Sequence, residues 1–445
     1  MKEPLTDREF LKLTVPFMLS TLTQPLMGAV NTAVMGYMPD PKYIAAVSLG
    51  AILFNTVYWL FGFLRVSTTG YAAQAYGAAS TRLGMLAFFK PLVIALLVGF
   101  ACILLQRPIL SFYLGFMRPA QDVADLCRIY FDILIWGAPL VLLNYVALGW
   151  LMGQARIRAS VFMQMSMNIL NMVLSVAFVY GLGWGVRGVA WATLLCQIYG
   201  GALSVFLIHI CGRFGYRKLP WKEILDWHNF VSMIQVNANL MIRTACLMAV
   251  NNMVAAVGVS LGTIVLAANA VLLQIKDIMS FLIDGIANGA SVFAGKAMGA
   301  GNLSYLKQDI RTSFKWSAVC ALLLMAGYWL GRETLIGLFT DIDAVRAVAA
   351  RYEIWVLLYP LCGFVGLTLY GVFCGITWTA PVRNMMAFAA FAFFVSSFFL
   401  APRFGNDGLW VAYLVFMLSQ SAFLGFMCRY LGRRFEETVP AAGKG

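Results

Sequence analysis

Charged residues and histidine are scarce in this sequence. Only 11% of its 445 residues are charged, whereas an average soluble domain carries about 25%. Hydrophobic residues make up 61% of the chain, more than a core alone can bury, so much of the surface must face lipid. The two histidines, His209 and His228, lie near the ends of apolar runs, which argues against a histidine metal site.

Cysteine motifs are missing as well. The nine cysteines are scattered through apolar runs, with no CxxC pair and no spacing typical of metal ligands. They indicate small buried side chains rather than a disulfide framework. An intramembrane enzyme would need a converging acid, base or nucleophile set, and no HExxH is present. We therefore expect neither an enzyme nor a cofactor or metal ion.

The net charge of +13 has a membrane explanation. Lys and Arg fall mostly in short loops between apolar runs, as the positive-inside rule expects, and no basic stripe with interleaved aromatics marks a polar segment. With a cytoplasmic N-terminus, sixteen Lys and Arg fall in cytoplasmic segments and seven in external ones. We expect both termini in the cytoplasm, no binding of nucleic acid and, because the first apolar run is too long, no cleavable signal peptide.

Twelve long apolar segments follow one another along the chain. A helix crosses a bilayer with about 20 residues, and turn residues such as those at 405–408 separate the segments. The segments cover residues 10–37, 43–76, 84–106, 121–152, 157–180, 187–211, 228–258, 262–298, 304–331, 344–376, 381–400 and 407–431. The sequence therefore predicts an all-α integral membrane protein with twelve transmembrane helices.

The second half of the chain repeats the first at a shift of about 222 residues. Residues 72–78 fall on residues 294–300, and Gly149 and Gly153 fall on Gly371 and Gly375. Six spans in each half make the repeats parallel, an arrangement typical of transporters with a central cleft between two pseudo-symmetric bundles. The predicted domains are an N-terminal six-helix lobe (1–212), a cytoplasmic linker (213–229) and a C-terminal six-helix lobe (230–445).

Several short runs carry a family resemblance that extends over nearly the whole chain. They are residues 30–36 (VNTAVMG), 63–70 (FLRVSTTG), 73–78 (AQAYGA), 168–171 (NILN), 241–243 (MIR), 266–270 (LAANA) and 284–285 (DG). In this order, on a duplicated unit, the set resembles the DinF-like branch of the MATE (multidrug and toxic compound extrusion) transporters.

This resemblance implies a function and a location. It implies export of amphipathic, often cationic, small molecules against H⁺ or Na⁺, by rocker-switch alternation of two lobes that form a V-shaped cleft. It also implies a monomer in the bacterial cytoplasmic (inner) membrane. Many relatives carry an acid where this chain has Asn31, and others at the positions of Ser175, Asn239 or Ser291. The coupling carboxylate is therefore not identified by the resemblance.

Charges inside the apolar segments are the first candidates for ion coupling, because each costs at least about 2.5–3.5 kcal/mol in a bilayer. The repeat maps Arg65 to Ala287, one turn from Asp284, so we expect Arg65 and Asp284 at similar depths. Asp284 would take up a proton or cation, with Arg65 lowering its pKa. The alternative is that each is a structural charge with partners in its own lobe, and for Lys276 and Asp277 a structural pair is the expectation.

Asp40 and Asn31 are the candidates in the first helix. Asp40 lies between two prolines, where it either caps the next helix or binds protons or cationic drugs on the external side. Asn31 stands at the position of the acid found in many relatives. Both remain in the set of coupling candidates.

Polar and methionine side chains on the first and fifth helices predict a substrate-binding patch. Gln24, Met27 and Asn31 share one helical face, as do Asn168 and Asn171. Intramembrane amides also hold helices together, so this alternative stays open. The predicted substrate-binding residues are Gln24, Met27, Asn31, Met35, Asn168, Asn171, Arg243 and Asp284.

Two other kinds of transport protein remain to be weighed. A lipid-linked saccharide flippase of the same superfamily would be expected to have more helices or a strongly cationic cleft. A channel would need a filter-like re-entrant loop, and none is visible in the sequence.

Overall fold

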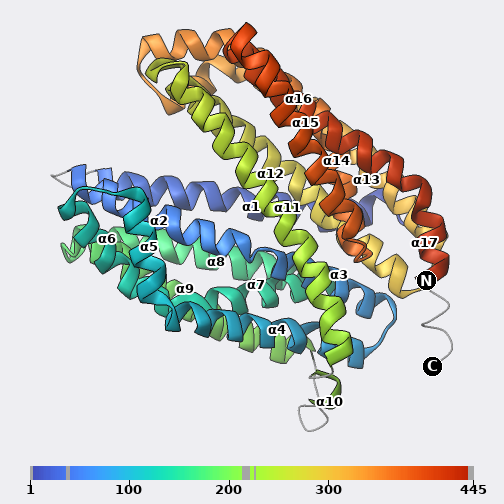
Figure 1. Cartoon of the computed structure of the whole chain (residues 1–445). Helices are drawn as coiled ribbons and strands as arrows, with labels where there is room; N and C mark the ends of the chain where they lie inside the picture. The colour runs from blue at the N-terminus through green and yellow to red at the C-terminus, as the bar shows by residue number, and fades with distance from the viewer. Residues whose placement is uncertain (1–3, 37–40, 213–220, 225–226, 439–445) are drawn as a thin grey trace. The chain divides into compact units, whose positions relative to one another are not determined.

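The computed structural model describes residues 4–36, 41–212, 221–224 and 227–438, and helices account for almost all of this chain (Figure 1). The first half contains α1 (Asp7–Gly36), α2 (Pro41–Leu60), α3 (Phe63–Gly77), α4 (Thr81–Leu104), α5 (Gln106–Met117), α6 (Gln121–Leu134), α7 (Ala138–Gly153), α8 (Ile157–Val176) and α9 (Gly185–Gly212). After the short α10 (Trp221–Ile224), the second half contains α11 (Trp227–Ser260), α12 (Thr263–Gly299), α13 (Leu303–Phe339), α14 (Asp343–Gly375), α15 (Ala380–Phe404), α16 (Asn406–Met427) and α17 (Leu431–Thr438).

The predicted membrane spans are confirmed as helices. Within the described residues, eleven stretches are helical, long and apolar enough to cross a membrane. The 30-residue α1 precedes them and covers the first predicted segment. Each of the twelve predicted segments thus falls on one helix or on two helices joined end to end.

Two predicted segments are broken within the first half. Residues 43–76 form α2 and α3, which meet at a turn around Gly62, and residues 121–152 form α6 and α7 around a 3₁₀ turn at Ile135–Gly137. Their repeat counterparts α12 and α14 run without interruption. Pro139 stands at the start of α7, whereas its repeat counterpart Pro360 lies inside the unbroken α14, so the proline alone does not cause the break.

Packing divides the chain into two compact units that do not coincide with the predicted lobes. One unit comprises Leu22–Met233, and the other joins Met1–Thr21 to Ile234–Gly445. We call them the N-terminal unit and the C-terminal unit. The predicted N-terminal lobe begins at residue 1, whereas the start of α1 packs with the second half; the predicted lobes and the cleft between them stay a prediction.

Small residues of α12 let the start of α1 pack closely in the C-terminal unit. A side chain on Gly285 would collide with Met18, and one on Gly289 would collide with Thr14. Phe10 stacks on Phe293 with ring centroids 5.7 Å apart. In a bilayer such contacts stabilise by close van der Waals packing rather than by the hydrophobic effect, and the glycines of α12 let the first turns of α1 approach closely enough to make them.

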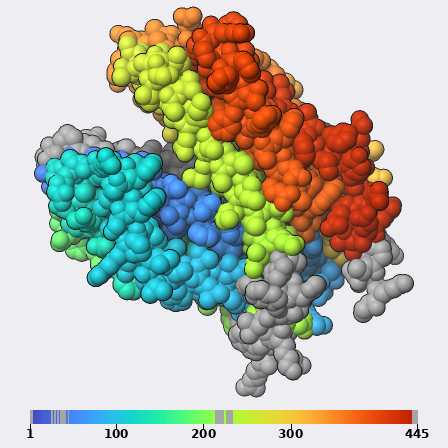
Figure 2. Space-filling view, viewed as in Figure 1, coloured from blue at the N-terminus to red at the C-terminus, as the bar shows by residue number. Residues whose placement is uncertain are grey.

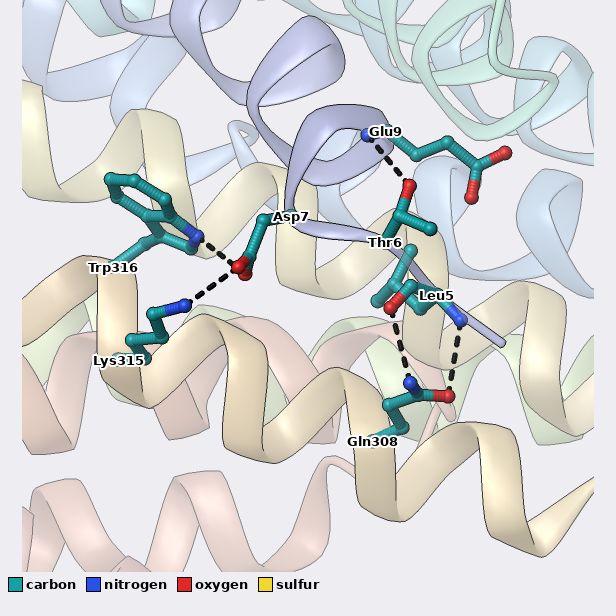
Figure 3. A network of polar contacts seen from close by, with 7 residues as sticks. All are labelled: Leu5, Thr6, Asp7, Glu9, Gln308, Lys315 and Trp316. Atoms are coloured by element: carbon teal, nitrogen blue, oxygen red, sulfur yellow. Dashed lines mark hydrogen bonds and ion pairs between the residues drawn. The ribbon is translucent and has the colours of Figure 1, made fainter. Parts of the chain in front are cut away.

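Polar contacts hold the same segment on α13 (Figure 3). The amide side chain of Gln308 accepts from Leu5 N at 3.0 Å and donates to Leu5 O at 3.1 Å. Asp7 accepts from Lys315 Nζ at 2.6 Å and from Trp316 Nε1 at 2.9 Å. The two hydrogen bonds to Asp7 hold the pKa of its carboxyl below the usual value.

The helix α11 lies beside the last helices of the C-terminal unit, drawn in orange and red in Figure 2. Asn239 of α11 accepts from Arg383 Nη1 of α15 at 3.0 Å and donates at 3.2 Å to the Oγ1 of Thr379, the residue before α15.

The internal repeat is visible inside each unit as the same helix contact. Gly149 of α7 packs against the carbonyl oxygen of Arg65 in α3, and Gly371 of α14 packs against that of Ala287 in α12. A side chain at either glycine would collide with that carbonyl. Gly153 and Gly375 repeat the contact one turn further, against Thr69 and Ser291. The predicted equivalence of Arg65 and Ala287 is therefore confirmed by packing.

Candidate functional site

A buried lysine and its acidic neighbour on α12 form an ion pair within a membrane-spanning helix. Lys276 of α12 has 7% of its side chain exposed, and its Nζ lies 2.6 Å from Oδ1 of Asp277, whose side chain is 48% exposed. Lys276 Nζ also donates to Tyr413 Oη of α16 at 3.1 Å. The structure thus places a cation inside the unit and leaves its counter-ion accessible from outside.

Two tyrosine rings enclose this ammonium group. Lys276 Nζ lies 5.3 Å from the ring centroid of Tyr413 and 5.7 Å from that of Tyr359 on α14. The two rings stack on each other with centroids 6.4 Å apart. Ring faces carry negative partial charge, so the pair stabilises a cation between α12, α14 and α16.

The face of α12 that carries Lys276 continues to Asp284. Lys276, Ser280 and Asp284 follow at intervals of four residues and therefore share one side of the helix. Ser280 Oγ and Tyr359 Oη share a hydrogen bond, and Asp284, which is half-buried, lies close enough to Tyr359 to act on it electrostatically. The predicted coupling residue Asp284 thus belongs to the same site as Lys276.

An amide cluster positions α16 against α12 at the other end of this face. Asn269 and Asn406 exchange hydrogen bonds of 2.7 and 2.9 Å, and Trp410 Nε1 donates to Asn269 Oδ1 at 3.0 Å. Trp410 in turn packs edge-on against Tyr413, with centroids 6.2 Å apart. Because the buried amides satisfy each other, they fix the register of α16 and with it the position of the Tyr413 hydroxyl.

Arg243 lies on an aromatic ring elsewhere in the same unit. Its guanidinium stands 4.0 Å from the ring centroid of Tyr370 on α14. Its Nε is buried and, among the described residues, has no hydrogen-bond partner. The predicted substrate-binding residue is therefore a cation in contact with α14, and no sequence pattern indicates this ring.

The polar residues of the N-terminal unit connect helices. Asn168 Nδ2 of α8 donates to Thr23 Oγ1 of α1 at 2.6 Å. Asn171 Nδ2 donates to Thr193 Oγ1 of α9 at 3.1 Å. Both asparagines are buried, with exposures of 8% and 3%. Both amides therefore connect two helices, which is the role that the sequence leaves open beside substrate contact.

The remaining predicted residues fall in different places. Arg65 is half-buried on α3 and belongs to the N-terminal unit, whereas Asp284 belongs to the C-terminal unit. Met27 is half-buried on α1. Gln24, Asn31 and Met35 also lie on α1, but their side chains are outside the described part of the structure, as is the whole of Asp40.

Sequence reasoning missed Tyr359, Tyr413 and Ser280. The spacing of four residues from Lys276 to Ser280 and Asp284 was a signal for Ser280, but no local pattern joins α12 to the two tyrosines. The sequence also contains one GxSxG pattern, at residues 258–262. Its first three residues end α11, and its Ser260 hydroxyl donates to Val257 O at 2.7 Å.

Comparisons with known proteins agree with this architecture. The family model MatE matches residues 16–177 and 240–402. The chain is 34% identical over 417 residues to DNA damage-inducible protein F of Escherichia coli, covering 93% of this chain and 90% of that protein. It is 24% identical over 474 residues to Probable multidrug resistance protein NorM of Rhizobium meliloti, covering 99% and 96% of the two chains.

Solved structures show the same fold. A MOP superfamily transporter from Pyrococcus furiosus superposes with a TM-score of 0.86 at 18% identity, covering 97% of this chain and 96% of that one. A multidrug resistance MATE family transporter in an outward-facing conformation superposes with a TM-score of 0.85 at 19% identity, with the same coverage. The twelve-helix fold and the family are therefore established, and the protein is a transporter, not an enzyme. This chain is a multi-pass membrane protein that belongs to the MATE family of transporters, in its DinF-like branch.

Proposed function

We propose that the protein is a secondary active exporter of amphipathic, mostly cationic small molecules, which it exchanges for H⁺ or Na⁺ by rocker-switch alternating access. Family membership supports transport, and the names of relatives support the substrate class: one is a Multidrug and toxin extrusion protein of Mus musculus, 26% identical over 421 residues. We place the protein as a monomer in the inner membrane of a bacterium, with both termini cytoplasmic. This orientation rests on the distribution of Lys and Arg.

The observation that carries the coupling mechanism is the accessible carboxylate of Asp277 beside the buried ammonium of Lys276. In this structure Lys276 neutralises Asp277 as an internal cation would. A proton or Na⁺ that reaches Asp277 from the exposed side competes with Lys276 for the same oxygen. Lys276 then keeps its hydrogen bond to Tyr413 and its contacts with both rings, which offset part of the cost of losing its countercharge.

Asp284 supplies a second carboxylate on the same face, about two turns from Lys276. A cation bound there would lie near the hydroxyl of Tyr359, whose ring also accepts cations. An organic cation and a coupling ion can therefore compete for one negatively charged face of α12. Such competition is what exchange requires, since the two cations then bind alternately rather than together.

The residues of the N-terminal unit enter this proposal as substrate contacts. Asn31 and Asp40 stay coupling candidates, and Gln24, Met27, Met35, Asn168 and Asn171 stay candidates for contact with substrate. Flexible methionines suit a pocket that accepts many apolar shapes. Arg65 stays a coupling candidate in the N-terminal unit.

Reconstitution into liposomes tests the proposal. Export of a fluorescent organic cation is followed under an imposed pH gradient and, separately, a Na⁺ gradient. We expect Asp277→Asn and Asp284→Asn to lower the gradient-driven rate by roughly tenfold or more, equivalent to about 1.4 kcal/mol. Asp40→Asn and Asn31→Ala are measured in the same assay, because both residues stay coupling candidates.

Asp341→Asn is the matched control, because this carboxylate is 99% exposed and pairs with Arg346, outside α12. Its rate should equal that of the wild-type protein. If neither gradient drives any cation in the wild-type protein, the exporter assignment is wrong. If transport occurs but the α12 variants match wild type, transport remains and the coupling site is elsewhere.

A lipid-linked saccharide flippase is the second candidate. Lys276 and Arg243 are cations within membrane-spanning helices, and both could attract a lipid phosphate group. Both are already held by tyrosine rings, which favours a structural or cation-competing role over anion binding. Scrambling of a fluorescent lipid-pyrophosphate saccharide in the same liposomes distinguishes the two functions.

A further inference from the structure

Asp309 is a carboxylate without a countercharge in the interior of the C-terminal unit. It lies on α13 with 0% of its surface exposed. Ser313 Oγ, one turn further along the helix, donates to Asp309 Oδ1 at 3.1 Å. The second oxygen, Oδ2, is buried and has no hydrogen-bond partner among the described residues. Its neighbours in sequence, Gln308 and Arg311, are polar, so the sequence alone suggests a solvated surface.

No cation of the surrounding helices neutralises Asp309 in the described part of the chain. The charged residues of the elements packed against α13 are Asp7, Arg8, Glu9 and Lys12 at the start of α1, Lys276, Asp277, Asp284 and Lys296 on α12, and Asp343, Arg346, Arg351 and Glu353 on α14. Among these cations, Lys276 pairs with Asp277 and Arg346 with Asp341, whereas Lys296 and Arg351 lie over the rings of Tyr305 and Tyr352. On α13 itself, Lys315 binds Asp7.

An ionised carboxylate in this position would be a buried, unpaired charge, which protein interiors do not tolerate without a partner. The neutral acid fits the same geometry. Oδ1 then acts as the carbonyl oxygen that accepts from Ser313, and Oδ2 carries the proton. We propose that Asp309 is a proton-binding site of the C-terminal unit, occupied in this arrangement and able to exchange its proton only when α13 separates from the helices that cover it.

A line of buried hydroxyls extends from this acid. Ser313 and Ser317 follow Asp309 at intervals of four residues, and both have 0% exposure. Ser317 shares a hydrogen bond of 2.6 Å with Thr368 of α14. Hydroxyl groups both donate and accept, so they can carry a proton where a hydrocarbon side chain cannot.

Helix register shows where this line ends. Gly371 and Gly375 of α14 pack against Ala287 and Ser291 of α12, so the two helices run parallel with a constant offset. Thr368 precedes Gly371 by three residues, and Asp284 precedes Ala287 by three. The hydroxyl line therefore reaches the level of Asp284. The use of this proton in transport rests on the proposed function, whereas its presence on Asp309 does not.

Infrared spectroscopy of the protein in lipid nanodiscs tests the proposal without a transport assay. A protonated carboxyl has a carbonyl stretching band that an ionised one lacks. At neutral pH we expect Asp309→Asn to remove such a band from the wild-type spectrum. Asp277→Asn is the control, because Asp277 is half exposed and paired with Lys276, and its spectrum should keep the band.

Ser313→Ala provides a second variant in case Asp309→Asn does not fold. Loss of the hydrogen bond to Oδ1 should shift the same band to higher frequency. In D₂O the wild-type band should move slowly, since the proton is enclosed, and faster when added substrate drives conformational cycling. A wild-type spectrum without the band, or a band that both Asp309→Asn and Ser313→Ala leave unchanged, overturns the proposal even if export is normal.

Discussion

Lys276 and Asp277 are adjacent in α12 and form an ion pair of 2.6 Å, yet one side chain is 7% exposed and the other 48%. Consecutive residues on a helix point about 100° apart, so one can face the interior while the next faces outward. The pair therefore joins a lysine held by two tyrosine rings in the interior of the C-terminal unit to a carboxylate that is half exposed.

Removing the charge of Asp277 and removing the charge of Lys276 should change the stability of the protein differently. Asp277→Asn leaves Lys276 buried without its countercharge and should destabilise the protein by about 1–3 kcal/mol, less than a fully buried pair because Asp277 is half exposed. Lys276→Met keeps the volume and removes the charge, so its stability should equal or exceed that of the wild type. Thermal unfolding in detergent measures both, and the reverse order would contradict the assignment of Lys276 as the buried partner.

Tyr413→Phe separates the hydrogen bond of Lys276 from the ring contact. The phenylalanine ring keeps the cation–π contact, whereas the hydrogen bond of 3.1 Å is lost. A hydrogen bond to a charged group is worth about 1.5–3 kcal/mol, and the loss should appear as lower thermal stability. Lys276→Met/Tyr413→Phe is the control: without the ammonium group, the tyrosine substitution should have a much smaller effect. Equal effects in both backgrounds would show that the hydroxyl acts on another partner.

The contact of Asp7 with Lys315 and Trp316 should depend on pH. The two hydrogen bonds lower the pKa of Asp7 from its usual value of 3.8. The contact is therefore fully formed above that value and is lost as the pH falls through the lowered pKa. Trp316 fluorescence, taken as the difference between wild type and Trp316→Phe, should change in this acid range.

Asp7→Asn serves as the control for this titration, because it removes the ionisable group while leaving an oxygen that accepts from Trp316. The fluorescence change should then disappear. A transition that persists in Asp7→Asn would come from another carboxyl.

The repeated glycine contacts should have equal importance in the two units. Gly149→Ala and Gly371→Ala each drive a methyl group into a carbonyl, of Arg65 and of Ala287 respectively. Overpacking of this kind costs about 1–3 kcal/mol in each case. Gly327→Ala on α13 is the control, since nothing lies within 4 Å of the added methyl. It should leave stability unchanged or raise it, because alanine favours helix.

The sequence predicted the membrane spans well because their signal is local. Hydrophobic length needs no knowledge of neighbours, and each predicted segment falls on one helix or a broken pair. The breaks themselves were missed at Gly62 and Ile135–Gly137, since the apolar composition continues through them. The equivalence of Arg65 and Ala287 was also correct, because the glycines that face these two residues repeat at the same spacing as the residues themselves.

Site residues were harder to predict, because their partners lie on other helices. The charge of Asp284 within an apolar segment predicts a functional role, but its position near Tyr359 follows only from the packing of α12 against α14. From the sequence, Asn168 and Asn171 could contact either substrate or another helix. In the structure both make hydrogen bonds between helices. The sequence does not mark Asp309 as a buried acid, because Asp309 stands among the polar residues at the start of α13.

The sequence by itself determined that the chain spans a membrane, how many helices cross it and that its two halves repeat. The signals for these features are hydrophobic length, turn residues and repeated glycines, and each can be read within one segment or between two equivalent segments. Only the tertiary structure decided which charges are buried and what they touch. Lys276 and Asp277 have the same local setting in the sequence, yet one packs between tyrosines of α14 and α16 and the other does not. The same is true of the start of α1, which packs in the C-terminal unit because α12 offers it glycines at the right spacing. Burial depends on which surfaces meet, and this is a property of distant segments rather than of any one of them.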